Sequence, residues 1–257
     1  MSLQSEFAQV ALDGGRAALV TVVRTDTDIP LGRKLLVRAD GASSGSLGDE
    51  RLEELARSDA EELIWIERCE LREHDGVTLF VDVTGPPPRL VVFGAVDFAA
   101  ALCRVARAAG WRPFVVDPRS RFATPERFPE AEEVIAAWPA DALARIGGID
   151  KATYLAVLTH DPKLDDAALL ASLDSDAPYI GAMGSRRAQA RRRERLVAAG
   201  VTDAQLERIA APIGLDLGGT TAEETAVSIM GELIAVRNSR DGGRLSASSG
   251  RIHEVGT

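Results

Sequence analysis

The residues best suited to chemistry are a glycine turn and the arginines after it, in the string YIGAMGSRR that begins at position 179. An apolar strand leads into the glycines, and a serine follows that can cap the next helix. The exposed backbone N–H groups, the helix dipole and two arginines together suit a phosphate or another compact anion. The predicted anion site consists of Gly181, Gly184, Ser185, Arg186 and Arg187. The four arginines further along this helix are predicted to form a solvated, salt-bridged face.

A second candidate is the loop APIGLDLGG at 211–219, which precedes the last helix. Loops that precede helices in open α/β sheets gather at the ligand crevice. The candidate ligand-binding residues of this loop are Gly214, Asp216 and Gly218. A connector shaped only by helix capping explains the same string equally well, so both interpretations stay open.

A third candidate follows a predicted strand over 154–158, where Thr159 and His160 precede Asp161. A histidine at the end of a buried strand could act as an acid, a base or a ligand. A lone histidine beside an aspartate is more often polar lining. The sequence contains no Ser/His/Asp signature and no metal-ligand spacing, so it predicts no nucleophile and no metal site.

The scaffold for these residues is predicted from the string between Arg89 and Asp117. Apolar runs at 90–93 and 114–116 indicate two buried parallel strands, and residues 98–109 carry the apolar spacing of a helix. This strand–turn–helix–strand unit, with its acidic residue after the second strand, predicts a Rossmann-type domain. Its turn carries Gly94 but has Val96 where a dinucleotide site needs a second glycine. We therefore predict a Rossmann scaffold that disfavours NAD(P).

The segment before this unit predicts a small α+β module. We expect helices over 3–12 and after Asp49, and strands over 17–23, 34–37, 63–70 and 78–83, with a glycine- and serine-rich loop at 40–48. Three prolines in GPPPR, at 85–89, mark the boundary. The predicted fold class is α/β: residues 1–85 form this module, residues 89–237 form a Rossmann-type domain with a mainly parallel sheet, and residues 238–257 form a disordered tail.

Beyond the core unit, a long loop is predicted after Asp117, with a further element over 132–138. Helices are expected over 165–173, from 185 to Gly200, over 202–209 and from Thr221 onward, where Glu224 completes a capping box. A short strand is expected to enter at 178–180 and to break at Gly181.

Composition excludes several functions. The chain has 257 residues, 46% hydrophobic residues and a formal net charge of −9, which argues against broad nucleic-acid binding. No apolar run approaches the roughly 20 residues of a membrane span, and the N-terminus lacks the features of a signal peptide, so a cytoplasmic protein is expected. Two cysteines, Cys69 and Cys103, are too few for a disulfide framework.

Taken together, these segments resemble the XdhC/CoxI family of xanthine dehydrogenase accessory factors. The resemblance extends from about Ala17 to Arg237, and FATPERFP, LTHDPKLDD, YIGAMGSRR, PIGLDLG and TAEETAVSI match family segments in order. It implies a chaperone that binds the molybdenum cofactor transiently while a sulfur ligand is installed. It also implies delivery to an apo molybdenum hydroxylase such as xanthine or carbon monoxide dehydrogenase, with a cysteine desulfurase as a further partner and a homodimer as the assembly.

The sequence departs from the family pattern in two places. Many members have G-S-x-S-G-G-C-x-E in the N-terminal module, and Arg51 stands here at the cysteine position. A guanidinium cannot replace a thiolate as a molybdenum or sulfur ligand. Many members also have G-x-G-H in the Rossmann turn, where this chain has GAVD.

Three functional hypotheses follow from the sequence. The first is a cofactor-binding chaperone without turnover of its own. The second is an NAD(P)-dependent oxidoreductase, which Val96 and the lack of a proton donor oppose. The third is a structural paralogue that binds only protein.

Overall fold

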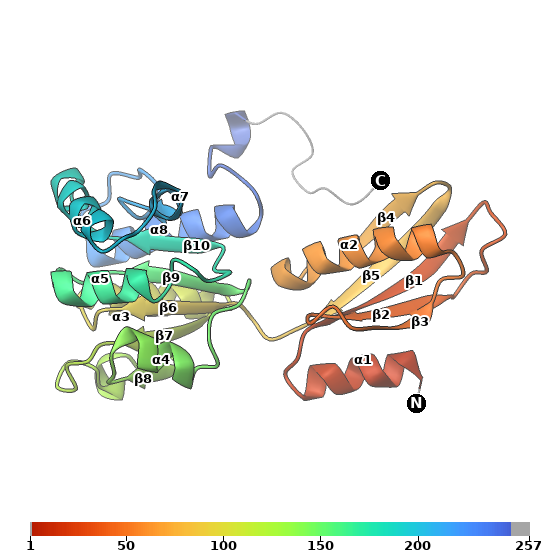
Figure 1. Cartoon of the computed structure of the whole chain (residues 1–257), viewed down its shortest axis with the longest axis horizontal. Coiled ribbons are helices and arrows are strands. Elements are labelled where there is room, and N and C mark those ends of the chain that lie inside the picture. The colour runs from red at the N-terminus through yellow and green to blue at the C-terminus, as the bar shows by residue number, and fades with distance from the viewer. Residues whose placement is uncertain (1, 248–257) are drawn as a thin grey trace. The chain divides into compact units, whose positions relative to one another are not determined.

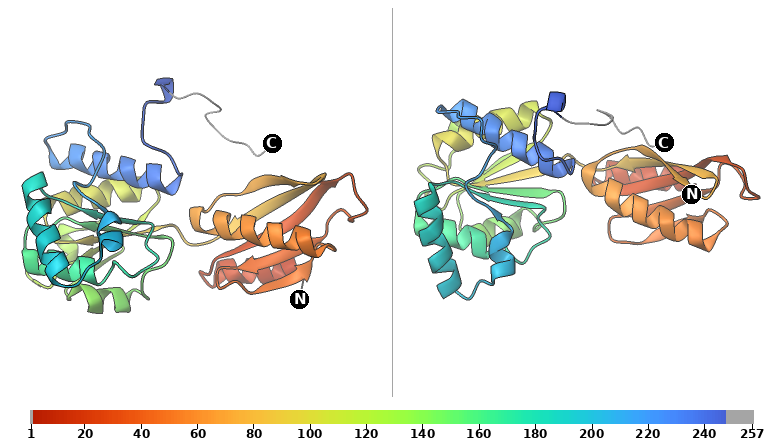
Figure 2. Two further views of the ribbon diagram at one scale, coloured as in Figure 1. Left: turned by 45° about the horizontal axis from the view of Figure 1, so that its top comes forward. Right: turned by 90° about the horizontal axis from the view of Figure 1, so that it is seen from above.

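The computed structural model describes residues 2–247, which form two compact units, one up to Pro86 and the other over Pro87–Gly243 (Figures 1 and 2). The distal half of the tail predicted after Asn238 lies outside the described residues. Within the described half, residues Leu245–Ala247 form a 3-10 turn. No described helix is long and apolar enough to cross a membrane.

The N-terminal unit is a five-stranded antiparallel sheet with one helix on each face. The strand order is β3-β2-β1-β5-β4, with β1 at Ala17–Thr25, β2 at Lys34–Arg38, β3 at Ser43–Ser46, β4 at Glu70–His74 and β5 at Val77–Thr84. Helix α1 (Leu3–Leu12) covers one face, where Phe7 packs near Leu19 and Leu36. Helix α2 (Glu50–Ile66) covers the other, where Ala56, Ala60, Leu63 and Ile64 are buried.

Two predictions for this unit are wrong. The expected strand over 63–70 does not form, because Leu63 and Ile64 continue the buried stripe of α2, and β4 begins only at Glu70. The stripe has the spacing of a helix, which outweighs the local β propensity of an Ile-Trp-Ile run. The loop expected at 40–48 contains β3, because its backbone pairs with β2 from Lys34↔Ser46 to Val37↔Ser43. Helix α2 begins directly after Asp49 as predicted, and Asp49 caps it by accepting a hydrogen bond from the Leu52 N–H at 2.8 Å.

The C-terminal unit is a six-stranded parallel sheet in the order β8-β7-β6-β9-β10-β11. Its strands are β6 (Arg89–Phe93), β7 (Arg112–Val116), β8 (Glu133–Ile135), β9 (Thr153–Val157), β10 (Tyr179–Ala182) and β11 (Ile209–Ala210). The chain runs outward from β6 through β7 to β8, then returns to the other side of β6 and continues outward. This is the doubly wound Rossmann arrangement, and the predicted fold class is confirmed.

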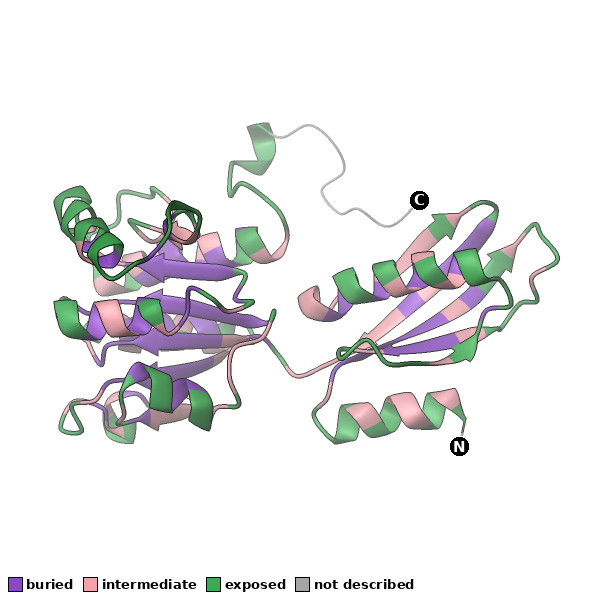
Figure 3. Ribbon diagram, viewed as in Figure 1, coloured by how far each residue is buried: buried purple, intermediate pink, exposed green. Residues whose placement is uncertain are grey.

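Helices cover both faces of this sheet, so its strands are buried almost throughout (Figure 3). Helix α3 (Asp97–Ala108) and helix α8 (Ala222–Arg237) pack on one face through Leu102, Ile229 and Leu233. The helices of the other face are α4 (Pro139–Arg145), α5 (Pro162–Leu170), α6 (Arg186–Ala198) and α7 (Asp203–Glu207). Helix α4 has no counterpart in the prediction.

Smaller differences concern element boundaries. Gly181 lies inside β10 rather than breaking it, and α5 begins three residues earlier than expected, with Pro162 in its first turn. Helix α7 stops at Glu207, and Ile209, which was expected to lie in this helix, forms β11 with Ala210 beside β10. The capping box of Thr221 and Glu224 at the start of α8 is confirmed.

Each unit has its own buried core, so we expect the fragment 87–243 to fold alone. Urea unfolding followed by circular dichroism should give a single cooperative transition, with a midpoint close to that of the same unit in the full chain. A broad, non-cooperative transition would contradict the division at the proline segment.

Candidate functional site

The candidate residues gather at the carboxyl edge of the parallel sheet, where the loops after each strand meet. Strand order reverses between β6 and β9, which is where ligands bind in open α/β sheets. Gly94 follows β6, Asp117 follows β7, Thr159 and His160 follow β9, and Gly184 follows β10. The topology therefore brings residues that are up to 90 positions apart to one edge.

At the switch point the turn after β6 packs directly on the end of β9. Gly94 has φ +109°, and a Cβ at this position would lie 3.0 Å from the Cβ of Thr159. Only glycine combines this backbone conformation with so close an approach. The first glycine of the turn thus holds two strand ends together.

Asp117, the acidic residue that a dinucleotide enzyme would direct to a ribose, is fully buried and already engaged. One of its oxygens accepts the Ala95 N–H at 2.9 Å, and Arg119 donates to both, at 2.8 and 2.7 Å. Burial acts to raise the pKa of Asp117, but the hydrogen bonds from Arg119 and Ala95 outweigh it and hold that pKa below its usual value. Asp117 therefore remains a carboxylate with its hydrogen-bonding capacity used within the protein.

The turn that would face a diphosphate is occupied as well. Val96 is the N-cap of α3 and makes no side-chain capping bond. Arg127 reaches back from the loop after β7 and donates to the Ala95 carbonyl at 3.1 Å. A cation from the protein itself therefore lies against the backbone that a pyrophosphate would approach.

The segment after β9 has a structural part and an exposed part. Thr159 is buried, and its hydroxyl accepts the Asp161 N–H at 2.7 Å. Asp161 caps α5 by accepting the Lys163 N–H at 2.9 Å. His160 is exposed, and its ring makes no hydrogen bond to any residue between 2 and 247. Of the predicted pair, His160 alone presents a side chain to solvent.

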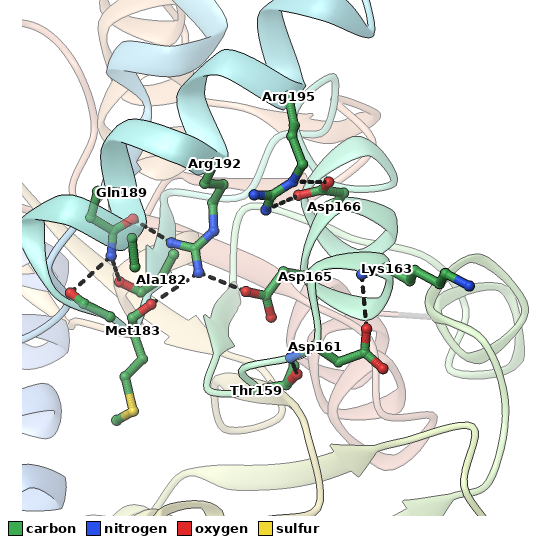
Figure 4. A network of polar contacts seen from close by, with 12 residues as sticks. Thr159, Asp161, Lys163, Asp165, Asp166, Ala182, Met183, Gln189, Arg192 and Arg195 are labelled. Carbon is green, nitrogen blue, oxygen red and sulfur yellow. Dashed lines mark hydrogen bonds and ion pairs between the residues drawn. The ribbon is translucent and has the colours of Figure 1, made fainter.

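A buried ion pair joins α5 to α6 beside the end of β10 (Figure 4). Arg192 of α6 donates to Asp165 of α5 at 2.7 Å, and their side chains are only 5% and 6% exposed. The same guanidinium donates to the Met183 carbonyl at 3.0 Å and to the Gln189 side chain. Burial raises the pKa of Asp165, and the neighbouring Arg192 opposes that change.

Gln189 completes this network at the glycine turn. Its amide donates to the Ala182 carbonyl at 3.2 Å and to the Gly184 carbonyl at 3.1 Å. Gly184 has φ +131°, and Ser185 caps α6 by accepting the Ala188 N–H at 3.2 Å. Side chains of α6, Gln189 and Arg192, thus fix the turn that precedes their own helix.

The arginines of α6 fall into two groups. Arg192, Arg193 and Arg195 are ion-paired, with Asp165, Asp203 and Asp166 respectively. Arg186, Arg187 and Arg191 are exposed and form no hydrogen bond or ion pair within the described part of the chain. Two of these unpaired cations occupy the first turn of α6, beside its N–H groups and the positive end of its dipole. This arrangement can bind a phosphate or another compact anion.

Gly181 is required for packing within the sheet and does not face the predicted anion site. It is buried in β10, and a Cβ there would lie 2.5 Å from Ile213 and 2.6 Å from the Tyr179 ring. The PIGLDLG loop that contains Ile213 is anchored in turn by Glu232, which accepts the Gly214 N–H at 2.6 Å and the Tyr179 hydroxyl.

The rest of this loop is open. Asp216 and Gly218 are exposed, and Gly218 has φ +69° with open space around the position of a Cβ. The structure thus places Gly214 in a supporting role and leaves Asp216 and Gly218 free to meet a ligand.

Several residues of this region escaped the sequence prediction. Asp165, Arg192, Arg119 and Glu232 hold the strand ends and loops in place, although none was a candidate. Arg119 follows the predicted Asp117 by two positions, which is a usable signal. Arg192 lies within a run of three arginines, and nothing local distinguishes the buried one from its neighbours.

The position of the family cysteine lies in the first turn of α2. Arg51 is 80% exposed there and pairs with Asp75 at 3.4 Å. Next to it, Glu53 accepts the Ser46 hydroxyl at 2.7 Å and the Leu47 N–H at 3.0 Å, which lowers its pKa. Glu53 thus holds the segment before α2 in place, while Arg51, in the first turn of the helix, presents a cation to solvent. No cluster of metal-ligating side chains occurs between residues 2 and 247.

Fold and site together define a two-unit α/β protein with a Rossmann-type domain whose dinucleotide turn is internally occupied. Residues 90–233 match the XdhC Rossmann domain, and residues 11–73 match the XdhC and CoxI family. The chain belongs to the XdhC and CoxI family, which confirms the resemblance seen in the sequence.

Three relatives illustrate the family. The chain is 25% identical to the uncharacterized protein YqeB of Escherichia coli over 97% of its length and 49% of the relative. It is 30% identical to a probable xanthine dehydrogenase component of Bacillus subtilis over 62% of this chain and 46% of the relative. It is 27% identical to the molybdenum cofactor insertion chaperone PaoD of Escherichia coli over 59% of this chain and 41% of the relative. The chain thus spans less than half of each relative.

Among solved structures, a xanthine dehydrogenase from Bacillus halodurans superposes with a TM-score of 0.65 at 24% identity. The match covers 91% of this chain and 66% of that one, and it shows the shared fold.

The buried ion pair leads to a prediction about stability. Arg192→Met or Asp165→Ala should each lower the free energy of unfolding by about 3–5 kcal/mol, because each leaves an uncompensated buried charge. The double variant should lose less than the sum of the two. Asp203→Ala, which removes the partner in the exposed Arg193 pair, should cost less than about 1 kcal/mol. Urea unfolding of all four variants measures this; strictly additive losses would show that the two groups do not interact.

Proposed function

We propose that this protein is an accessory chaperone that binds the molybdenum cofactor and assists its sulfuration and insertion into an apo molybdenum hydroxylase. Membership of the XdhC and CoxI family and the name of the PaoD relative support this role. The observation that carries the proposal is the pair of unpaired arginines, Arg186 and Arg187, at the start of α6.

The donor set suits the phosphate of a pterin cofactor. Arginine offers a two-pronged donor, and the backbone N–H groups of the first turn add further donors along the helix dipole. Asp216 and Gly218 of the PIGLDLG loop, with His160 after β9, would line the same edge of the sheet. When bound, the cofactor would supply the metal and its sulfur chemistry, and this chain would hold and orient it without turnover of its own.

The sulfur would have to come from another protein. Residue 51 offers no thiol, and burial with the neighbouring Asp82 raises the pKa of the Cys69 thiol. Burial in α3 raises the pKa of Cys103 to about 12. Neither cysteine is therefore a ready thiolate at neutral pH. Because this chain offers no such thiolate, we propose a cysteine desulfurase as the partner that supplies sulfur. The second partner would be an apo-hydroxylase such as xanthine or carbon monoxide dehydrogenase. The protein would act as a homodimer in the cytoplasm.

Three features of the turn and of the residue after β7 argue against the oxidoreductase alternative. Asp117 is engaged by Arg119, Arg127 lies against the turn, and Val96 stands where the backbone must approach a diphosphate.

The anion site is tested by substitution of one arginine. Arg186→Ala should weaken binding of the molybdenum cofactor, or of a simpler pterin phosphate, by about ten- to a hundredfold, because a charge-assisted contact contributes roughly 1.5–3 kcal/mol. The loss should shrink as salt rises. Fluorescence titration measures the affinity. Arg191→Ala is the matched control, since Arg191 is also exposed and unpaired but lies beyond the first turn. Equal losses in the two variants would mean that only the general charge of α6 matters.

We expect NAD and NADP to bind weakly or not at all, because the protein's own groups occupy the turn and its acidic residue. Isothermal titration calorimetry of the full chain should give no dissociation constant below about 1 mM, which corresponds to roughly 4 kcal/mol. Micromolar affinity for either dinucleotide would contradict this and revive the oxidoreductase hypothesis.

A further inference from the structure

A cavity outside the crevice lies between α6, α7 and the edge strand β11. Its volume is about 220 Å³. A water takes up about 30 Å³ of liquid, so the space suits a small molecule of about seven non-hydrogen atoms. Its lining is divided by chemistry: Gln189, Arg192 and Arg193 supply polar groups, and Leu196, Leu206 and Ile209 supply apolar walls.

The polar end contains a donor without an acceptor. The Arg192 side chain is 5% exposed, and its Nε has no hydrogen-bond partner among the described residues. Buried donors are nearly always satisfied in folded proteins, so an orphaned N–H on a residue that lines the cavity indicates a missing acceptor. Arg193 uses one nitrogen to bind Asp203 at 2.6 Å and keeps further N–H groups for another acceptor.

We propose that this cavity binds a small organic carboxylate with a short apolar body. The carboxylate would accept from Arg192 and Arg193, and its apolar part would cover Leu206 and Ile209. Inorganic phosphate fits poorly, because its more concentrated charge would have to be desolvated against the apolar walls. An amine would place a third cation beside the two guanidinium groups.

The position of the cavity links it to the turn before α6. Gln189 and Arg192 line the cavity and also hold the carbonyls of Ala182, Met183 and Gly184. A bound carboxylate would therefore change the surroundings of residues 182–184 without entering the crevice. This inference does not rest on the proposed chaperone function.

The test is a titration of the ¹⁵N-labelled full chain with hexanoate, followed by NMR. Hexanoate should bind with a dissociation constant of about 1 mM and shift the amides of residues 189–196 and 206–211. Hexanol, hexylamine and inorganic phosphate, the matched probes, should each bind at least about tenfold more weakly. Absence of these shifts, or equal binding of hexanol or hexylamine, would overturn the proposal.

Two variants and one control locate the site. Arg193→Ala should weaken hexanoate about tenfold through loss of a charge-assisted contact, and Leu206→Trp should abolish binding by filling the space. Arg191→Ala, on the same helix but outside the cavity lining, should change the affinity less than about twofold. If Arg191→Ala and Arg193→Ala weaken hexanoate equally, the probe binds the charged face of α6 and the cavity is not its site.

Discussion

The buried pair of Asp165 and Arg192 is the interaction on which the geometry of the turn before α6 depends. It joins α5 to α6, and through Arg192 and Gln189 it fixes the carbonyls at the end of β10. A buried pair of this kind adds little net stability compared with apolar packing, but loss of one partner is strongly destabilising. Its value here is positional: it sets where the first turn of α6, with Arg186 and Arg187, faces the strand ends.

On the other side of the switch point, the polar groups of the Rossmann turn form hydrogen bonds to other residues of the same domain. Gly94 keeps the conformation that the fold requires, with φ +109° against Thr159. The groups that would serve a dinucleotide are instead satisfied internally, since Asp117 accepts from Ala95 and Arg119. The packing of the turn and the core requires this fold, whereas two exposed arginines that form no ion pair among residues 2–247 lie at the start of α6. Fold and function are separable for this reason.

Pairing also decides which charges of α6 are available. The three arginines in its second half each form an ion pair with an aspartate of α5 or α7, and those in its first turn form none within the described part of the chain. In an acidic protein, with a net charge of −9, this leaves a local cationic site without making the molecule attractive to polyanions in general. The helix dipole adds to this positive charge, because its positive end lies at Arg186 and Arg187 in the first turn of α6.

The amino-acid sequence predicts the Rossmann unit from β6 to β7, the N-caps Asp49, Ser185 and Thr221, and the glycine turn before α6. These features follow from apolar periodicity, capping and turn chemistry, which act between near neighbours in the chain. It did not determine β3, whose serines form a strand only because β2 supplies backbone partners. It also misassigned residues 63–66, where the buried stripe of α2 overrode local β propensity. Tertiary structure alone decided that Arg192 is buried and Arg191 is exposed, since the difference lies in an aspartate 27 residues away on another helix.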